Sequence, residues 1–187
     1  MATTISFPTA VSDPTGTNAA NAFADDGTLT DLIINTDADI TWHTFSSLSI
    51  SAGATINGIE IVAEAQGKSS ANTPSFSVYN GTSWSSTQTF NSAITRFLVV
   101  YDPAWGASND LWGLSWDATT AAAIQVKMDC STLPGGRNFR FDYLKVRVTY
   151  TAAATGYTHD VNSVAAASIS KVNSVATASI GKINSVD

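Results

Sequence analysis

The stretch FRFDYLKVRVTY, residues 139–150, carries two apolar series of opposite parity. Phe139, Phe141 and Tyr143 occupy odd positions, whereas the apolar residues from Leu144 to Tyr150 occupy even positions. Successive side chains of a strand point to opposite faces, so a regular strand cannot bury both series on one face. One extra residue in the strand would correct the parity. We therefore predict a β-bulge near Tyr143-Leu144; the alternative is a strand whose two halves are covered on different faces.

A two-residue period also runs through the middle of the chain. Apolar and polar residues largely alternate over residues 59–66, 75–78 and 124–129, which is typical of strands with one buried face. Asn80-Gly81 lies between two such runs and predicts a hairpin with a type I′ turn. Residues 118–123 predict one short turn of helix. The pattern therefore indicates an all-β fold, an antiparallel β-sandwich of jelly-roll-like type.

The domain organisation follows from the same pattern. Residues 1–27 are rich in small polar residues and predict an N-terminal arm, which neighbouring subunits would hold; an irregular first strand within residues 1–22 is the alternative. Residues 28–152 predict the β-sandwich. Residues 153–160 are expected to be a linker. Residues 161–187 form a C-terminal extension of eleven-residue repeats, which we call the C-terminal repeats.

The composition argues against several classes of partner. Of the 187 residues, 13% are charged, about half the usual share of roughly 25%, and the formal net charge is −6. Arg137, Arg140, Lys145 and Arg147 are the only closely spaced basic residues and fit a solvated strand face, so we expect no nucleic-acid partner. The chain shows neither a secretory signal nor an apolar run of membrane-spanning length, and we expect no membrane partner. Cys130, the one cysteine, is expected at a strand end.

The sequence contains no recognisable catalytic motif, and we expect a non-catalytic protein without metal or cofactor. Glu60 and Glu64 would lie about 13 Å apart on one strand at roughly 3.3 Å per residue, too far apart for a retaining or inverting glycosidase pair, and fit a solvated face. His43 and His159 have neither a zinc-binding spacing nor a nucleophile motif beside them. The aspartates between residues 25 and 39 fit turns and caps better than a calcium loop.

Five tryptophans offer a different kind of site. Trp112 and Trp116 are four residues apart and would share one side of an extended segment, which favours the core. Trp84 and Trp105 stand beside turn residues and are the better candidates for exposure. An exposed indole on a sandwich can stack on a sugar, so we identify Trp84 and Trp105 as candidate glycan contacts.

The C-terminal repeats carry the candidate assembly residues. Val161-Asn162-Ser163-Val164 recurs at residues 172–175 and, with Ile at its first position, at 183–186. An eleven-residue period also suits a right-handed coiled coil, but the Asn-Ser pairs and β-branched residues favour turns between short strands. About two and a half small units cannot bury a core alone, so other copies must cover their apolar residues. The expected assembly residues are Val161, Val164, Ile169, Val172, Val175, Ile180, Ile183 and Val186.

Four segments in chain order resemble a β-sandwich module of bacteriophage structural proteins and some bacterial surface proteins. They are SISAGATINGIEIVAEAQG (49–67), SVYNGTSWSST (77–87), DLWGLSWDA (110–118) and FDYLKVRVTYTA (141–152). The C-terminal KVNSVA units are similar to repeats at the ends of phage tail and virion proteins. The resemblance covers roughly residues 28–152 and implies a virion structural protein, a fibre or appendage or a capsid decoration component, without catalysis.

We accordingly expect a homo-oligomer in the virion, with a trimer as its simplest arrangement and other virion proteins as partners. The alternative is a carbohydrate-binding or adhesion module that recognises a host-surface glycan.

Overall fold

The structure is a computed structural model of the whole chain. It describes residues 1–12, 19–27, 29–34, 39–67, 74–89, 99–100, 104–129, 137–153, 171–172 and 175–176. The chain divides into two compact units, Met1–Ala152 and Ala153–Asp187. In the first unit every strand pair is antiparallel, and the helices among the described residues are the 3₁₀ turn η1 (Ala19–Ala22) and α1 (Ala118–Ala122). The predicted all-β class and the short helical turn are confirmed.

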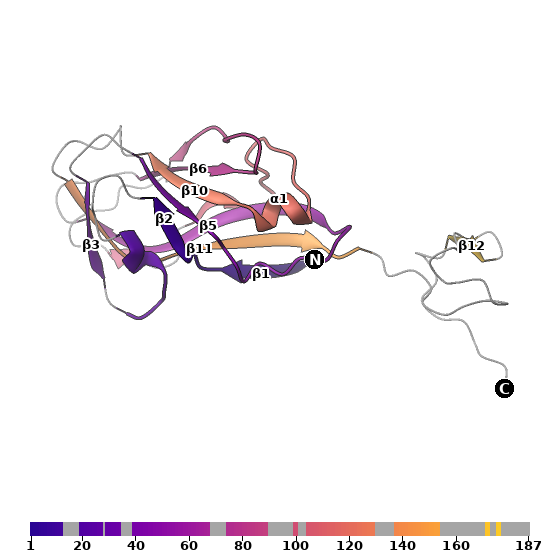
Figure 1. Ribbon diagram of the computed structural model, residues 1–187, viewed down its shortest axis with the longest axis horizontal. Helices are drawn as coiled ribbons and strands as arrows, with labels where there is room; N and C mark the ends of the chain where they lie inside the picture. The colour runs from indigo at the N-terminus through magenta and orange to yellow at the C-terminus, as the bar shows by residue number, and fades with distance from the viewer. Residues whose placement is uncertain are drawn as a thin grey trace. The chain divides into compact units, whose positions relative to one another are not determined.

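Two sheets make up the first unit (Figure 1). The first has six strands: β1 (Ala2–Ser6), β11 (Arg137–Thr151), β5 (Thr55–Gly67) and β8 (Val99–Val100) in that order, with β3 (Thr30–Ile34) also paired to β11 and β9 (Ala104–Ala107) also paired to β5. The second has five strands in the order β2 (Ala10–Ser12), β4 (Ile40–His43), β10 (Gln125–Asp129), β6 (Ser75–Tyr79) and β7 (Gln88–Thr89). Figure 1 shows β6 and β10 above the long strands β5 and β11.

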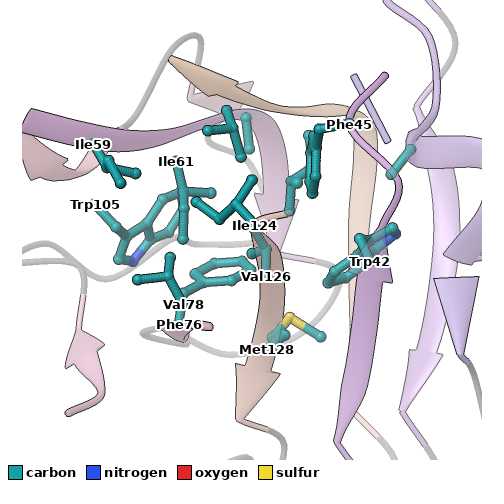
Figure 2. Packing of buried hydrophobic residues seen from close by; sticks show 14 of the residues in the cluster. Trp42, Phe45, Ile59, Ile61, Phe76, Val78, Trp105, Ile124, Val126 and Met128 are labelled. Atoms are coloured by element: carbon teal, nitrogen blue, oxygen red, sulfur yellow. The ribbon is translucent and has the colours of Figure 1, made fainter. Parts of the chain in front are cut away.

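The alternating apolar residues of both sheets enter one buried cluster, part of which is drawn in Figure 2. Ile59 and Ile61 of β5 face this cluster from one sheet, and Val78 of β6 and Val126 of β10 face it from the other. The predicted buried faces of these strands are therefore confirmed. Full burial of a large aliphatic side chain stabilises a fold by roughly 1.5–3 kcal/mol, so this shared cluster is the main stabilising feature of the unit.

The predicted bulge lies between Phe141 and Leu144 of β11. Phe141 is opposite Ala65 of β5 and Leu144 is opposite Ala63, so β11 advances three residues where β5 advances two. Because of the extra residue, both Phe141 and Leu144 point into the buried cluster. The bulge thus explains why the apolar residues of β11 change from odd to even positions. Asp142, inside the bulge, is buried and accepts hydrogen bonds from the backbone N–H groups of residues 26 and 27 at 3.3 and 3.0 Å.

Of the two alternatives for the N-terminal segment, the described residues form strands rather than a separate arm. β1 pairs with residues 146–150 of β11, and β2 pairs with residues 41–43 of β4. Thr and Val favour strands, and both segments find partners within their own chain. The compact unit Met1–Ala152 therefore includes both strands.

Of the C-terminal repeats the structure describes one strand pair. β12 (Lys171–Val172) and β13 (Val175–Ala176) are antiparallel, with Lys171 opposite Ala176 and Val172 opposite Val175. At this repeat the two short strands lie on either side of the Asn-Ser dipeptide in the sequence. The first and third repeats lie outside the described residues.

A close approach of backbone and indole ties β9 and the following loop to β5. Trp112 has a φ of 57°, unusual for a bulky residue, and its indole Nε1 donates to the carbonyl oxygen of Ile59 at 2.8 Å. The backbone N–H of Trp112 donates to Asp110 Oδ1 at 2.7 Å, and the carbonyl of Asp110 accepts from the N–H of Ile59 at 2.9 Å. Gly106, with a φ of 84°, leaves the room for this arrangement, because a Cβ there would meet Ile59 O and lie 2.7 Å from Trp112 Nε1.

We predict that Gly106→Ala is more destabilising than Gly113→Ala. Both glycines have a positive φ, which costs an L-residue about 1–2 kcal/mol, but a Cβ at Gly113 meets nothing within 4 Å. Gly106→Ala should lower the free energy of unfolding by about 1–3 kcal/mol more than Gly113→Ala, because it also crowds Trp112. Urea titrations of the two full-length variants followed by tryptophan fluorescence measure the difference. Equal losses would contradict the close packing of Gly106 against Trp112.

Candidate functional site

The predicted assembly residues fall mostly outside the described part of the chain. Val172 and Val175 are described, and each is the cross-strand partner of the other in the β12–β13 pair. The remaining candidates lie outside the described residues: Val161, Val164, Ile169, Ile180, Ile183 and Val186. Their role in assembly stays a prediction.

The predicted exposure of Trp105 is wrong. Trp105 belongs to β9, opposite Ile61 of β5, and only 2% of its surface is exposed. Its ring lies beside the ring of Phe76 (Figure 2), edge to face, with centroids 4.6 Å apart. Its indole Nε1 donates to Pro74 O at 3.0 Å. The glycine beside it follows within the same short strand and does not end it. Trp105 therefore forms part of the core and cannot contact a glycan in this structure.

Trp84 is exposed, as predicted. It keeps 38% of its surface accessible and is bridged to Tyr79 at the end of β6. The two rings lie 5.2 Å apart between centroids with an interplanar angle of 37°. The Nζ of Lys127, on the neighbouring strand β10, lies 4.9 Å from the centroid of the indole. Trp84 is thus an exposed ring held against side chains of two adjacent strands.

Polar side chains surround Trp84 on the outer face of the second sheet. Lys127 is opposite Ser77 of β6 on one side and Thr41 of β4 on the other, and Gln125 is opposite Tyr79. On β4 and β10 these positions alternate with buried residues, so Thr41, Gln125 and Lys127 face away from the core, whereas Ser77 of β6 is itself buried. Lys127 Nζ also lies 3.1 Å from the carboxylate of Asp39, which forms an ion pair at the edge of the site. We call Trp84, Tyr79, Lys127 and Asp39 the Trp84 platform.

The hairpin that carries Trp84 is fixed by hydrogen bonds on both sides. Asn80 Oδ1 accepts from the N–H groups of Thr82 and Ser83 at 3.0 and 2.9 Å, and Asn80 Nδ2 donates to Ser115 O at 3.1 Å. Ser85 donates its N–H to Val78 O at 2.8 Å, and its Oγ accepts from Val78 N–H at 3.0 Å. The backbone on either side of Trp84 is therefore held before any ligand arrives.

The predicted type I′ turn is wrong in detail. Asn80 and Ser83 face each other, with the Asn80 N–H donating to Ser83 O at 3.2 Å, so Gly81 and Thr82 are the two loop residues. Of the two, only Gly81 has a positive φ, 89°, which is the pattern of a type II′ turn. The side chain of Asn80 binds the loop N–H groups instead of entering the loop itself, a common role of Asn at turns.

The charged residues of the first sheet form a separate surface. Glu60 of β5 pairs with Arg147 of β11, with 3.6 Å between Oε1 and Nη1, and Arg140 Nη1 donates to Gln66 Oε1 at 3.3 Å. Lys145 Nζ lies 4.2 Å from the centroid of the Tyr143 ring. Glu64 is only 9% exposed, so the expected solvated face of β5 is wrong at this residue.

The remaining candidate groups are possible metal ligands, the two histidines and the cysteine. Within the described residues no group of three or more His, Cys, Asp or Glu side chains is arranged to hold a metal ion, and no helix is long and apolar enough to cross a membrane. His43 lies at the end of β4, and its Nδ1 is 3.1 Å from Thr44 Oγ1. His159 and Cys130 lie outside the described residues.

The carboxyl group of Asp117 has a lowered pKa and caps the helix α1. The backbone N–H and then the side chain of Thr120 hydrogen-bond to Asp117, which holds the pKa of this carboxyl below its ordinary value of 3.8. The pair forms a capping box at the start of α1. A lowered pKa means that the ionised cap stabilises α1 above the ordinary pKa and that this stabilisation is lost as the pH falls through the lowered value.

Comparison with protein-family models gives no match, and comparison with curated proteins gives none either. The geometry of the described residues therefore supplies the structural argument for function.

We predict that Trp84 supplies most of the quencher-accessible tryptophan emission. Trp42, Trp105 and Trp112 are buried and Trp116 is half-buried, so acrylamide should reach Trp84 first. Trp84→Phe should remove the largest share of the accessible emission in a Stern–Volmer experiment on the full-length protein. Trp105→Phe, the matched control, should leave that share unchanged, and the reverse result would contradict the placement of these two rings.

Proposed function

We propose that this chain is a non-catalytic structural protein of a bacteriophage virion, a fibre or appendage or a capsid decoration component. Its first unit would be a jelly-roll β-sandwich that forms the displayed body. Its C-terminal repeats would join copies of the chain into a homo-oligomer, with a trimer as the simplest form, alongside other virion proteins.

The strand order supports the jelly-roll part of this proposal. β1 and β3 pair with different stretches of β11, and β8 and β9 with different stretches of β5, so each pair fills one edge position. With β8 and β9 counted as one edge strand, the strands from β3 onward divide between the two sheets. The first sheet contains β3, β5, β9 and β11, and the second contains β4, β6, β7 and β10. In each sheet the later strand, β11 or β10, lies between two earlier ones, as in two interlocked Greek keys.

The observation that carries the structural role is the β12–β13 pair. Each strand has two residues, and a two-stranded hairpin in water is at best marginally stable even when its strands are longer. The repeats add apolar residues such as Ile169 and Ile180, which fewer than three small units cannot bury. Neighbouring copies would supply that cover through strand addition or a shared axis. The resemblance of residues 28–152 to a phage sandwich module points to a virion as the setting.

A second candidate function is carbohydrate binding or adhesion to a host-surface glycan. The exposed Trp84, beside Tyr79 and a charged pair, favours it. The two functions are compatible, because a displayed body can carry a receptor site while the repeats hold the assembly together.

We predict that deleting residues 161–187 leaves a folded first unit that no longer assembles. The buried cluster of the first unit is formed within residues 1–152, so the deletion should preserve its near-ultraviolet circular dichroism. Light scattering should give an oligomeric mass for the full-length protein and a monomeric mass for the truncated one. A full-length protein that is a monomer, or a truncated one that keeps the full-length oligomeric state, would contradict the proposal.

The double substitution of Ile169 and Ile180 by Asp should act like the deletion, because it would bury charges without partners. The matched control is the double substitution of Ser168 and Ser179 by Asp. It adds the same charge one position earlier in each repeat, where a strand side chain points to the opposite face. Assembly should therefore survive in the control and fail in the isoleucine variant.

A further inference from the structure

We infer that the Trp84 platform binds an uncharged pyranose ring of a glycan, with the sugar stacked on the indole of Trp84. This inference rests on the second candidate function and makes it specific, because it names the residues and the chemical class of the ligand. It leaves the role of the C-terminal repeats unchanged.

The first argument is that the ring is exposed although it is well supported. A large apolar side chain on a protein surface normally lowers its exposure by lying on its neighbours, and Trp84 has two such neighbours, Tyr79 and Lys127. It nevertheless keeps 38% of its surface accessible. Both contacts come from strands of the second sheet, and the accessible part of the indole is what these two side chains leave to solvent. A sugar ring can pack its C–H groups on such an accessible aromatic surface.

The second argument is that the ring is held in place before binding. The hydrogen bonds of Asn80 and Ser85 fix the hairpin on both sides of Trp84, and the contact with Tyr79 restricts the side chain. Little conformational freedom is then lost when a ligand stacks, which raises the affinity obtained from a small contact area.

The third argument concerns charge and hydrogen bonding. The ammonium group of Lys127 is already paired with Asp39 at 3.1 Å, so the platform offers no uncompensated cation to an anionic sugar. The whole chain carries a formal net charge of −6, which opposes anionic ligands further. The ammonium group of Lys127 provides N–H donors beside the ring, and Thr41 and Gln125 lie on the same face of the sheet as Lys127 and add neutral polar groups. Hydroxyl groups of an uncharged sugar match this set, because each can both donate and accept.

The test is isothermal titration of the full-length protein with a fixed panel of oligosaccharides. The uncharged probes are cellohexaose, maltohexaose and chitotetraose, and the anionic probes are a heparin hexasaccharide and a sialic acid tetramer. We expect at least one uncharged probe to bind with a dissociation constant of about 1 mM or below, the range of a weak single site. Trp84→Ala should weaken that binding about tenfold or more, and Trp84→Phe should weaken it about threefold or less, because a stacking face remains.

Ile5→Ala is the matched control. Ile5 is an exposed apolar residue, 43% accessible, on β1 of the other sheet, and its loss should leave sugar binding unchanged. Circular dichroism and the thermal midpoint verify that each variant is folded. Because Trp84 is exposed, we expect its substitution to leave both close to those of the parent protein.

The outcomes separate the inference from the function on which it rests. Binding of the anionic probes alone would overturn the inference and leave the glycan-binding function standing. No binding of any probe would overturn both. Uncharged binding that Trp84→Ala does not weaken would place the sugar elsewhere and overturn the platform. A fall in oligomeric mass for Trp84→Ala, without sugar binding by the parent protein, would identify the platform as a contact between copies and overturn the inference as well.

Discussion

The pairing of β11 with β5 is the constraint on which the rest of the first unit depends. β11 carries apolar residues of both parities, and only the extra residue between Phe141 and Leu144 lets both halves face the same core. The same bulge directs the buried carboxylate of Asp142 to the N–H groups of residues 26 and 27. It therefore anchors the segment that leads into β3, and β3 and β1 in turn complete the edge of the sheet along β11.

With the core between the two sheets, the outer face of the second sheet carries accessible polar side chains on β4 and β10. The buried residues of β4, β6 and β10 fill the space between the sheets, and the alternate positions are left to polar side chains such as Lys127. Trp84 adds an exposed ring to that polar face, at a hairpin that the side chain of Asn80 holds in shape. The C-terminal repeats offer a different case, because the one strand pair that the structure describes there has only two residues in each strand.

Sequence patterns predicted the features that depend on local alternation. The all-β class, the buried faces of β5, β6 and β10 and the bulge in β11 all follow from the parity of apolar residues, which a strand converts directly into a face. Features that depend on distant partners were missed. β1 pairs with a strand more than a hundred residues away, and nothing in its own composition identifies that partner. The burial of Trp105 likewise depends on Phe76 and Ile61, which lie on two other strands.

The platform itself was predicted only at Trp84. The hairpin signal was correct, but a type I′ turn with Asn80-Gly81 as its loop would place Trp84 opposite Ser77. The observed turn lies one residue later, which moves Trp84 opposite Tyr79 without changing its face. The turn type therefore decides which side chain supports the indole. Lys127 and Asp39 come from strands that pair only in the folded sheet, so a local pattern could not assign them to the platform.

The central claim is that the first unit is stable on its own whereas the C-terminal repeats need other copies, and residue-resolved hydrogen exchange at two protein concentrations tests it most directly. At a dilution where light scattering gives a monomeric mass, the account predicts slow exchange for the amides of β5 and β11 and unprotected exchange for residues 161–187. At a concentration where the mass is oligomeric, residues 161–187 should become protected while β5 and β11 stay unchanged. Protected C-terminal repeats in the monomer would contradict the account.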